Sequence, residues 1–418
     1  MRVGGWPAWP IHTADTAAAL TAVLSSQRWS VSGAWTGRTT REQEFAVRWA
    51  QFNGVPHCVP TANGSSSLLI SLEALDIGAG DEVIVPAMTW VAPATAVLNV
   101  NARPIIVDVD PRTLCLDLEA VKAAITPRTK AIIAVHLYGS MVDMDPLLAL
   151  ARTHGLKVIE DCAQSHGSRY AGRSAGAMGD IGIFSMHQGK VLTSGEGGAA
   201  ITSDPKLHRR LEQLRSDGRR YVDHVPRVGD AQLEEVGEIQ GSNFCLSEFQ
   251  AAILLDGVTR LEAQNLHRAL NARYLDQKLS ALGGLTPQAR PAAVQQQTYY
   301  HYLVRCDPAA FAGRSSAAIS RALQAELGFA VYPPYPALPR HRLYCPRTKR
   351  RFHLDEEHWA ALDPRRFVTP VATRAHSECI VFHHSVLLAE KSAMDVIVEA
   401  FAKIQRSPDQ IPIEERPQ

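Results

Sequence analysis

The sequence predicts an α/β protein with a mainly parallel central sheet in a large domain and a smaller C-terminal α+β domain. Between residues 56 and 202 short apolar strands alternate with helical segments, a pattern typical of a parallel sheet covered by helices. A long helical pattern starts near residue 250, and after residue 285 short strand and helix signals mix. The 418 residues, 46% of them hydrophobic, suffice for two or three domains. We expect a large domain at 1–255, and a linking helix with the small domain at 256–418.

The elements follow from local periodicity. Helical spacing predicts helices at 13–27 and 40–52, separated by a loop that contains Trp29 and Trp35. We then expect strands at 58–60, 82–86, 104–109, 131–136 and 157–159, one from 181 and one at 198–202, with helices at 68–75, 91–100 and 146–154 between them. The polar segment 217–232 suggests a mobile loop. The small domain should contain strands at 299–305 and 330–332 and helices at 315–327 and 388–405.

Composition narrows the function. The formal charge is +1 without clustered Lys or Arg, which argues against nucleic acid or a membrane surface and favours small-molecule partners. Seven scattered cysteines suggest neither a disulfide framework nor a metal site. The N-terminus meets Pro7 and Pro10 at once and lacks the apolar core of a secretion signal. We therefore expect a cytoplasmic protein with reduced thiols.

Lys190 is the candidate nucleophile. It follows the apolar strand that starts at Ile181 and precedes the glycine-rich return Ser194-Gly-Glu-Gly-Gly198. A lysine so placed is poorly suited to be a solvated surface charge. It is well placed to lose solvation and to form a Schiff base with an aldehyde cofactor.

Two other strand ends carry complementary groups. Gly64-Ser-Ser-Ser67 opens a helix just after a strand, so its free backbone N–H groups form an anion pocket suited to phosphate, although a simple helix cap is an alternative reading. Asp161 ends another buried strand and can pair with a protonated pyridine nitrogen. Gln164 can donate to a phenolate oxygen of the same ring. His166 is either a pocket residue or a satisfied core histidine.

Lys190, Asp161, Gln164 and the Gly64-Ser65 turn together resemble the type I pyridoxal-phosphate aminotransferases, specifically the DegT/DnrJ/EryC1/StrS sugar aminotransferase family. The likeness covers nearly the whole chain, through "SGEGG" and "GSNFCLSEFQAAILL" to "IVFHHSVLLAE". Within the family the chain is most similar to the subgroup that aminates 2-deoxy-scyllo-inosose with L-glutamine in aminoglycoside biosynthesis.

The resemblance implies a role for each matching residue. Lys190 would hold pyridoxal 5'-phosphate and shuttle a proton, Asp161 would pair with the pyridine nitrogen, and Gln164 with the ring oxygen. Trp90 would stack on the ring, and the phosphate would be bound by Gly64, Ser65 and Ser185. Asn243 would reach the phosphate from the neighbouring subunit of a homodimer.

The resemblance also implies a ping-pong aminotransferase that moves the amino group of L-glutamine to a keto-cyclitol, 2-deoxy-scyllo-inosose or scyllo-inosose. A nucleotide-linked keto-sugar is the alternative. Members that act on such sugars often carry Phe-His-Pro-x-Lys, whereas this chain has Met186-His-Gln-Gly-Lys190, which favours the cyclitol. From family position, Trp29, Trp35, Tyr138 and His166 are expected to form the wall that recognises the polyhydroxy ring.

Overall fold

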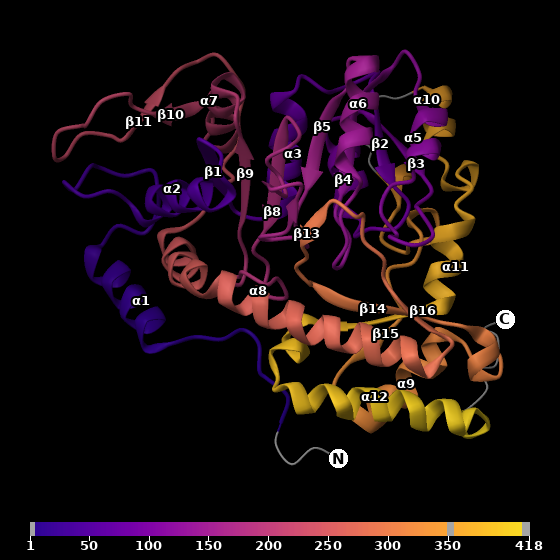
Figure 1. Cartoon of the computed structure of the whole chain (residues 1–418). Helices are drawn as coiled ribbons and strands as arrows, with labels where there is room; N and C mark the ends of the chain where they lie inside the picture. The colour runs from indigo at the N-terminus through magenta and orange to yellow at the C-terminus, as the bar shows by residue number, and fades with distance from the viewer. Residues whose placement is uncertain (1–4, 349–354, 412–418) are drawn as a thin grey trace.

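A seven-stranded sheet forms the centre of the large domain in the computed structural model, which describes residues 5–348 and 355–411 (Figure 1). Its order is β1-β9-β8-β5-β4-β2-β3. The strands are β1 (His57–Thr61), β2 (Glu82–Pro86), β3 (Arg103–Val107), β4 (Thr129–Val135), β5 (Lys157–Asp161), β8 (Ile181–Ser185) and β9 (Gly198–Thr202). The β9 strand is antiparallel to both neighbours, and the other pairings are parallel. The predicted mainly parallel sheet is confirmed.

Helices cover this sheet. They are α2 (Arg41–Asn53), α3 (Gly64–Ala74), α4 (Ala92–Asn99), α5 (Leu118–Ala124), α6 (Met144–His154) and α7 (Pro205–Arg215). The amphipathic α2 buries Phe45 and Trp49 completely and starts with a capping box at Thr40. The parallel strands are apolar and buried along almost their whole length, so polar groups can be placed only where the strands end. All the parallel strands present their carboxyl ends at one edge, where ligands bind in such sheets.

The 35-residue helix α8 (Glu248–Leu282), which runs below the large sheet in Figure 1, contributes to two hydrophobic cores. Leu254 and Leu261 pack in the core under the seven-stranded sheet, whereas Leu275 and Leu279 pack in the second core. A long helix is therefore present where the sequence pattern predicts one, and it packs in both cores. Not all its apolar positions are buried, however: Leu266, Leu270 and Leu282 are exposed.

The second core lies around a four-stranded antiparallel sheet of order β12-β14-β16-β15. Its strands are β12 (Leu285–Pro287), β14 (His301–Cys306), β15 (Val331–Tyr332) and β16 (Cys379–His383). Helices α9 (Ser316–Leu327) and α12 (Lys391–Arg406) pack together below it in Figure 1. Helices α1 (Ala14–Ser26), α10 (Glu356–Ala361) and α11 (Pro370–Glu378) complete the chain.

The expected division at residue 255 stays a prediction, because that position falls inside α8. Segments from both ends of the chain also pack on the other side of this division. Near the N-terminus Trp6 packs against the second core, while Leu338 and Ala372 of the C-terminal part belong to the first. The two parts are thus connected by more than the helix.

Local differences from the sequence expectations have simple causes. The segment 217–232 was expected to be a loop, but it contains β10 (Arg219–Tyr221), which pairs with β11 (Leu233–Glu235) in a charged hairpin. A three-stranded sheet joins β6 (Arg169–Tyr170), β7 (Arg173–Ser174) and the distant β13 (Val294–Gln296). These strands are too short to show periodicity. Across the described ranges, no helix has both the length and the apolar character needed to cross a membrane.

Candidate active site

A cavity of about 580 Å³ opens at the carboxyl edge of the large sheet, where strand ends meet segments of the second domain. Seven of the eight predicted site residues line it: Gly64, Ser65, Trp90, Asp161, Gln164, Ser185 and Lys190. They lie at, or shortly after, the carboxyl ends of four strands, β1, β2, β5 and β8. The parallel topology thus brings together residues that are far apart in the sequence, such as Gly64 and Lys190.

Lys190 has the environment expected of a nucleophilic lysine. Its side chain is 9% exposed, and its Nζ lies 3.8 Å from the centroid of the Tyr300 ring. Burial lowers the pKa of Lys190 to about 8, against an opposing effect of the Asp161 charge. A substantial fraction of the amine is therefore neutral near pH 8, and the neutral amine is the nucleophile.

Asp161 is the last residue of β5, Gln164 comes shortly after it, and both line the same cavity. The Asp161 carboxylate accepts a hydrogen bond from Ala163 N (3.0 Å), and burial raises its pKa although Ala163 N–H and Lys190 act in the opposite direction. Gln164 accepts from Tyr138 N through Oε1 (3.0 Å), which leaves its amide N–H groups available to donate. The arrangement suits a cationic ring partner for Asp161 and a hydrogen-bond acceptor for Gln164.

The start of α3 lies directly against the end of β8. A Cβ added to Gly64 would come within 2.7 Å of Ser185 Cβ, so glycine is needed for this close approach. Asn63 caps the helix by accepting from Ser66 N (2.8 Å). The N–H groups of Gly64 and Ser65 precede the first intrahelical bonds, and both residues line the cavity together with Ser185. This cradle has the donors and the helix dipole that bind a phosphate.

The opposite wall of the cavity was not predicted. It consists of Tyr300, His301, Tyr332 and Tyr335 from the second domain. His301 Nε2 and the Tyr332 hydroxyl form a hydrogen bond, and burial lowers the pKa of His301 well below its usual value. The aromatic-rich start of the predicted strand at 299–305 was the available signal. Only the fold shows that it faces Lys190.

Of the four residues expected to form the substrate wall, none is among those that line the cavity in the described chain. Trp29 is exposed and packs against Phe249, and Trp35 pairs through its backbone with Asp230. Tyr138 is buried behind Tyr335, to whose backbone N–H its hydroxyl is bonded (2.8 Å). These four side chains therefore do not line the cavity of the single chain, and the expectation that they recognise the polyhydroxy ring, which rests on family position, stays a prediction.

Of the two roles expected for His166, a pocket residue or a buried core histidine with a hydrogen-bond partner, the structure shows the second. Its Nε2 donates to Ser185 O (2.9 Å), and burial lowers its pKa to about 3, so it is neutral. It supports the strand end that carries Ser185 rather than lining the cavity. Asn243, the eighth predicted residue, is exposed and also lies outside the cavity of its own chain.

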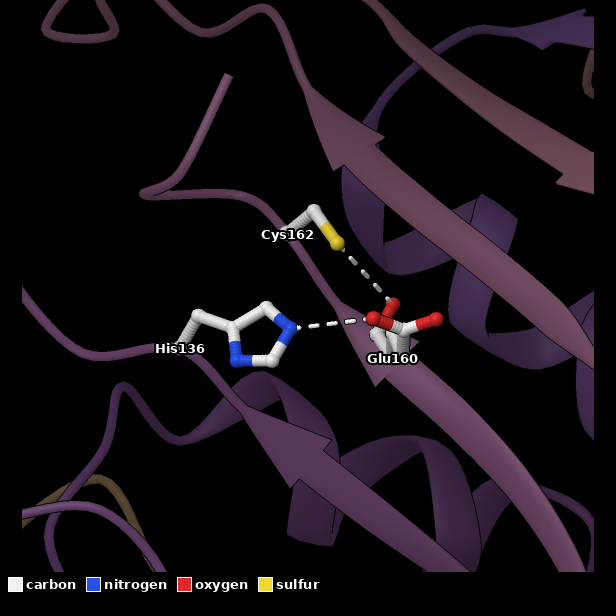
Figure 2. Close-up of side chains that lie close together, drawn as sticks. All are labelled: His136, Glu160 and Cys162. Atoms are coloured by element: carbon white, nitrogen blue, oxygen red, sulfur yellow. Dashed lines mark hydrogen bonds and ion pairs between the residues drawn. The ribbon is translucent and has the colours of Figure 1, made fainter. Parts of the chain in front are cut away.

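Behind the cavity, His136, Glu160 and Cys162 form a buried cluster (Figure 2). Glu160 accepts hydrogen bonds from His136 Nε2 (3.1 Å) and from the backbone N–H groups of Gly176, Met178 and Gly179. His136 Nδ1 accepts from Val142 N. These donors occupy the lone pairs that a metal would need. The cluster instead fixes the turn that leads into β8.

Comparisons with known proteins agree with this geometry. The model of the DegT/DnrJ/EryC1/StrS aminotransferase family matches residues 10–401. An L-glutamine:2-deoxy-scyllo-inosose aminotransferase of Streptoalloteichus tenebrarius is 49% identical over 406 residues, 97% of this chain and 96% of the relative. An L-glutamine:scyllo-inosose aminotransferase of Streptomyces griseus is 47% identical over 399 residues, 96% of this chain and 94% of the relative.

The X-ray structure of an aminotransferase from Psychrobacter cryohalolentis has a TM-score of 0.82 at 28% identity and covers 97% of this chain and 100% of its own. The resemblance seen in the sequence is therefore confirmed. The strand-end cavity and the near full-length matches lead to one conclusion: the chain belongs to the DegT/DnrJ/EryC1/StrS aminotransferase family and is a pyridoxal-phosphate-dependent aminotransferase.

Proposed function

We propose that this enzyme transfers the amino group of L-glutamine to a six-membered keto-cyclitol, 2-deoxy-scyllo-inosose or scyllo-inosose, in the biosynthesis of an aminoglycoside antibiotic. The observation that carries the proposal is the near full-length match, at 47–49% identity, to relatives named for these two reactions. The cavity supports it, because a polyhydroxy ring must be recognised by hydrogen bonds and the second-domain wall supplies phenol and imidazole groups.

The residues of the cavity fit pyridoxal 5'-phosphate. The cradle of Gly64, Ser65 and Ser185 would hold its phosphate, and Trp90 would cover one face of its ring. Asp161 would accept a hydrogen bond from the pyridine N–H. This accounts for a buried carboxylate that accepts one hydrogen bond, from Ala163 N, among the described residues. Gln164 would donate to the ring oxygen.

The bound cofactor supplies a carbonyl carbon that can carry an amino group and a ring that withdraws electrons. Lys190 would hold the cofactor through Nζ, and its neutral amine would accept and return the substrate proton. A pKa near 8 suits both roles at neutral pH. Asp161 would keep the ring nitrogen protonated, and Tyr300 covers Lys190 Nζ on the side of the second domain.

We also infer a cytoplasmic homodimer whose active sites are shared. All seven cysteines are free thiols, which accords with a reducing compartment. Asn243 is exposed and outside the cavity of its own chain, as expected of a residue that serves a neighbouring site. Mixing Lys190→Ala and Asn243→Ala chains should restore part of the activity in hybrid dimers. A fully active monomer in sedimentation would contradict the shared site.

The substrate is tested by steady-state transamination with L-glutamine, comparing 2-deoxy-scyllo-inosose, scyllo-inosose and nucleotide-linked keto-sugars at equal concentration. We expect turnover of the keto-inositols and none in a Lys190→Ala control. Turnover of nucleotide sugars alone would replace the cyclitol by the alternative substrate class. A strong preference for scyllo-inosose over the 2-deoxy compound would assign the enzyme to the second of the two named reactions.

A further inference from the structure

The two carbonyl groups that precede Lys190 are held by side chains from distant parts of the chain. His383 Nε2 lies 3.0 Å and His384 Nε2 3.2 Å from the carbonyl oxygen of Gly189. His383 ends β16, and His384 follows it. Both belong to the second domain and lie more than 190 positions away in sequence. One backbone oxygen in the Lys190 loop is thus hydrogen-bonded to two imidazole rings.

The tautomers make both imidazoles donors. His383 Nδ1 accepts from Ser385 N (3.3 Å), which leaves the proton on Nε2, opposite the Gly189 carbonyl. For His384, Nε2 also faces this carbonyl, which can only accept. Burial and the nearby Arg268 charge lower the pKa of both imidazoles, so they stay neutral donors. The two Nε2–H groups therefore converge on one acceptor.

Trp9 of the N-terminal segment holds the other carbonyl. Its Nε1–H donates to Gln188 O (3.0 Å). Its ring packs edge to face on His384, with centroids 4.6 Å apart, and lies 5.3 Å from the buried Arg268 guanidinium. Trp9 therefore contacts the Lys190 loop, the second domain and α8 together.

Other backbone donors of the loop bond either to its glycine-rich return or within the loop. Gln188 N donates to Gly195 O and Lys190 N to His187 O, both at 2.8 Å. A proline at position 188 would lose the first of these bonds. The backbone donors of the loop thus point within it, and its outward carbonyls at 188 and 189 are left for Trp9 and the two histidines.

We propose that Trp9, His383 and His384 are positioning residues that clamp the Gln188 and Gly189 carbonyls and so set the place of Lys190 in the cavity. This inference rests on the proposed role of Lys190. Through the clamp, the second domain and the N-terminal segment act directly on the lysine of the large domain. A mere packing role for these three residues would not require donors that converge on this loop.

The test is amide hydrogen exchange of the cofactor-loaded, full-length enzyme, followed by mass spectrometry of peptides covering residues 186–195. The variants are Trp9→Phe and the double variant His383→Leu/His384→Leu. His383→Gln/His384→Gln is the conservative version, because the glutamine amide can still donate. Trp6→Phe is the matched control. Its indole also donates to a backbone carbonyl, Leu327 O, but on the second domain away from the lysine loop.

We expect exchange in this peptide to rise about fivefold for each donor lost, the usual effect of one hydrogen bond, and to stay within twofold in the glutamine variant and in Trp6→Phe. At equal cofactor occupancy, kcat should be lower in the variants whose loop exchanges faster, while KM for L-glutamine stays constant. Unchanged exchange in both Trp9→Phe and the leucine variant would overturn the clamp. If the leucine variant does not fold, Trp9→Phe decides alone.

The exchange result is independent of the role proposed for Lys190. If Lys190→Ala retained turnover, the proposed function of the lysine would fail, yet the clamp would still be visible in the exchange of the loop. If Lys190→Ala is inactive and exchange is unaffected by the clamp variants, only the clamp fails.

Discussion

Glu160 and Asp161 are neighbours on β5, but they face two different environments on opposite sides of the strand. Glu160 receives four hydrogen bonds, from His136 and three backbone N–H groups. Although burial alone would raise its pKa, these donors lower it. Asp161 receives one, from Ala163, within the described residues, and burial raises its pKa.

The difference separates a structural carboxylate from a binding one. A buried carboxylate whose lone pairs all accept hydrogen bonds has no capacity left for a ligand. A buried carboxylate with unused lone pairs destabilises the fold until a cationic partner binds it. The same strand thus fixes the turn before β8 with one residue and presents an acceptor to the cavity with the next. The sequence singled out Asp161 by its place at the strand end, but it could not show how differently the two neighbours are hydrogen-bonded.

The largest expected effect is on stability, from Glu160→Gln. Breaking one partner of a buried charged network costs roughly 3–5 kcal/mol. Because the folded pKa of Glu160 is lowered, its contribution is fully present above about pH 4.5 and is lost as the pH falls through the folded value. Denaturant unfolding of wild type and variant at several pH values measures this. Equal stability at pH 7 would mean that the cluster in Figure 2 is not structural.

Asp161→Asn should have the reverse profile, with lost activity and retained stability. A neutral amide no longer keeps the ring nitrogen protonated, and the loss of one preorganised electrostatic contact costs about a hundredfold or more in turnover. Steady-state rates and thermal unfolding of the two variants, measured side by side, give the comparison. Activity near that of wild type would show that another group holds the ring.

The smallest expected effect is a shift in pH dependence. Capture of pyridoxal phosphate by the cofactor-free enzyme needs neutral Lys190, so its rate should rise with pH and level off above about pH 8. The Asp161 charge raises the pKa of Lys190, so Asp161→Asn should move the inflection to lower pH. Stopped-flow absorbance measures both curves. A shift to higher pH would contradict this electrostatic coupling.

The sequence predicted what periodicity and topology determine. The strand at 82–86 matches β2 at both ends, and the rule that ligands bind at the carboxyl ends of parallel strands placed Gly64, Asp161 and Lys190 in one cavity. Local apolar pattern is sufficient for this, because it determines both the strands and the positions where polar residues can follow them.

Contacts between distant segments could not be predicted in this way. Tyr300 and His301 reach the cavity from the point where β14 begins in the other domain, and Trp9 and His384 contact the Lys190 loop from opposite ends of the chain. No local pattern encodes such a contact. The exposed Leu266 and Leu270 of α8 show the same limit, since helical spacing does not reveal which face is left uncovered.

The most direct test of the account is reduction of the cofactor-loaded enzyme with borohydride, followed by peptide mapping. We expect a yellow protein and a single reduced cofactor adduct on Lys190, lost in Lys190→Ala although that variant still binds the cofactor. A label on any other lysine, or an equal label in Lys190→Ala, would contradict the assignment of this cavity as the active site.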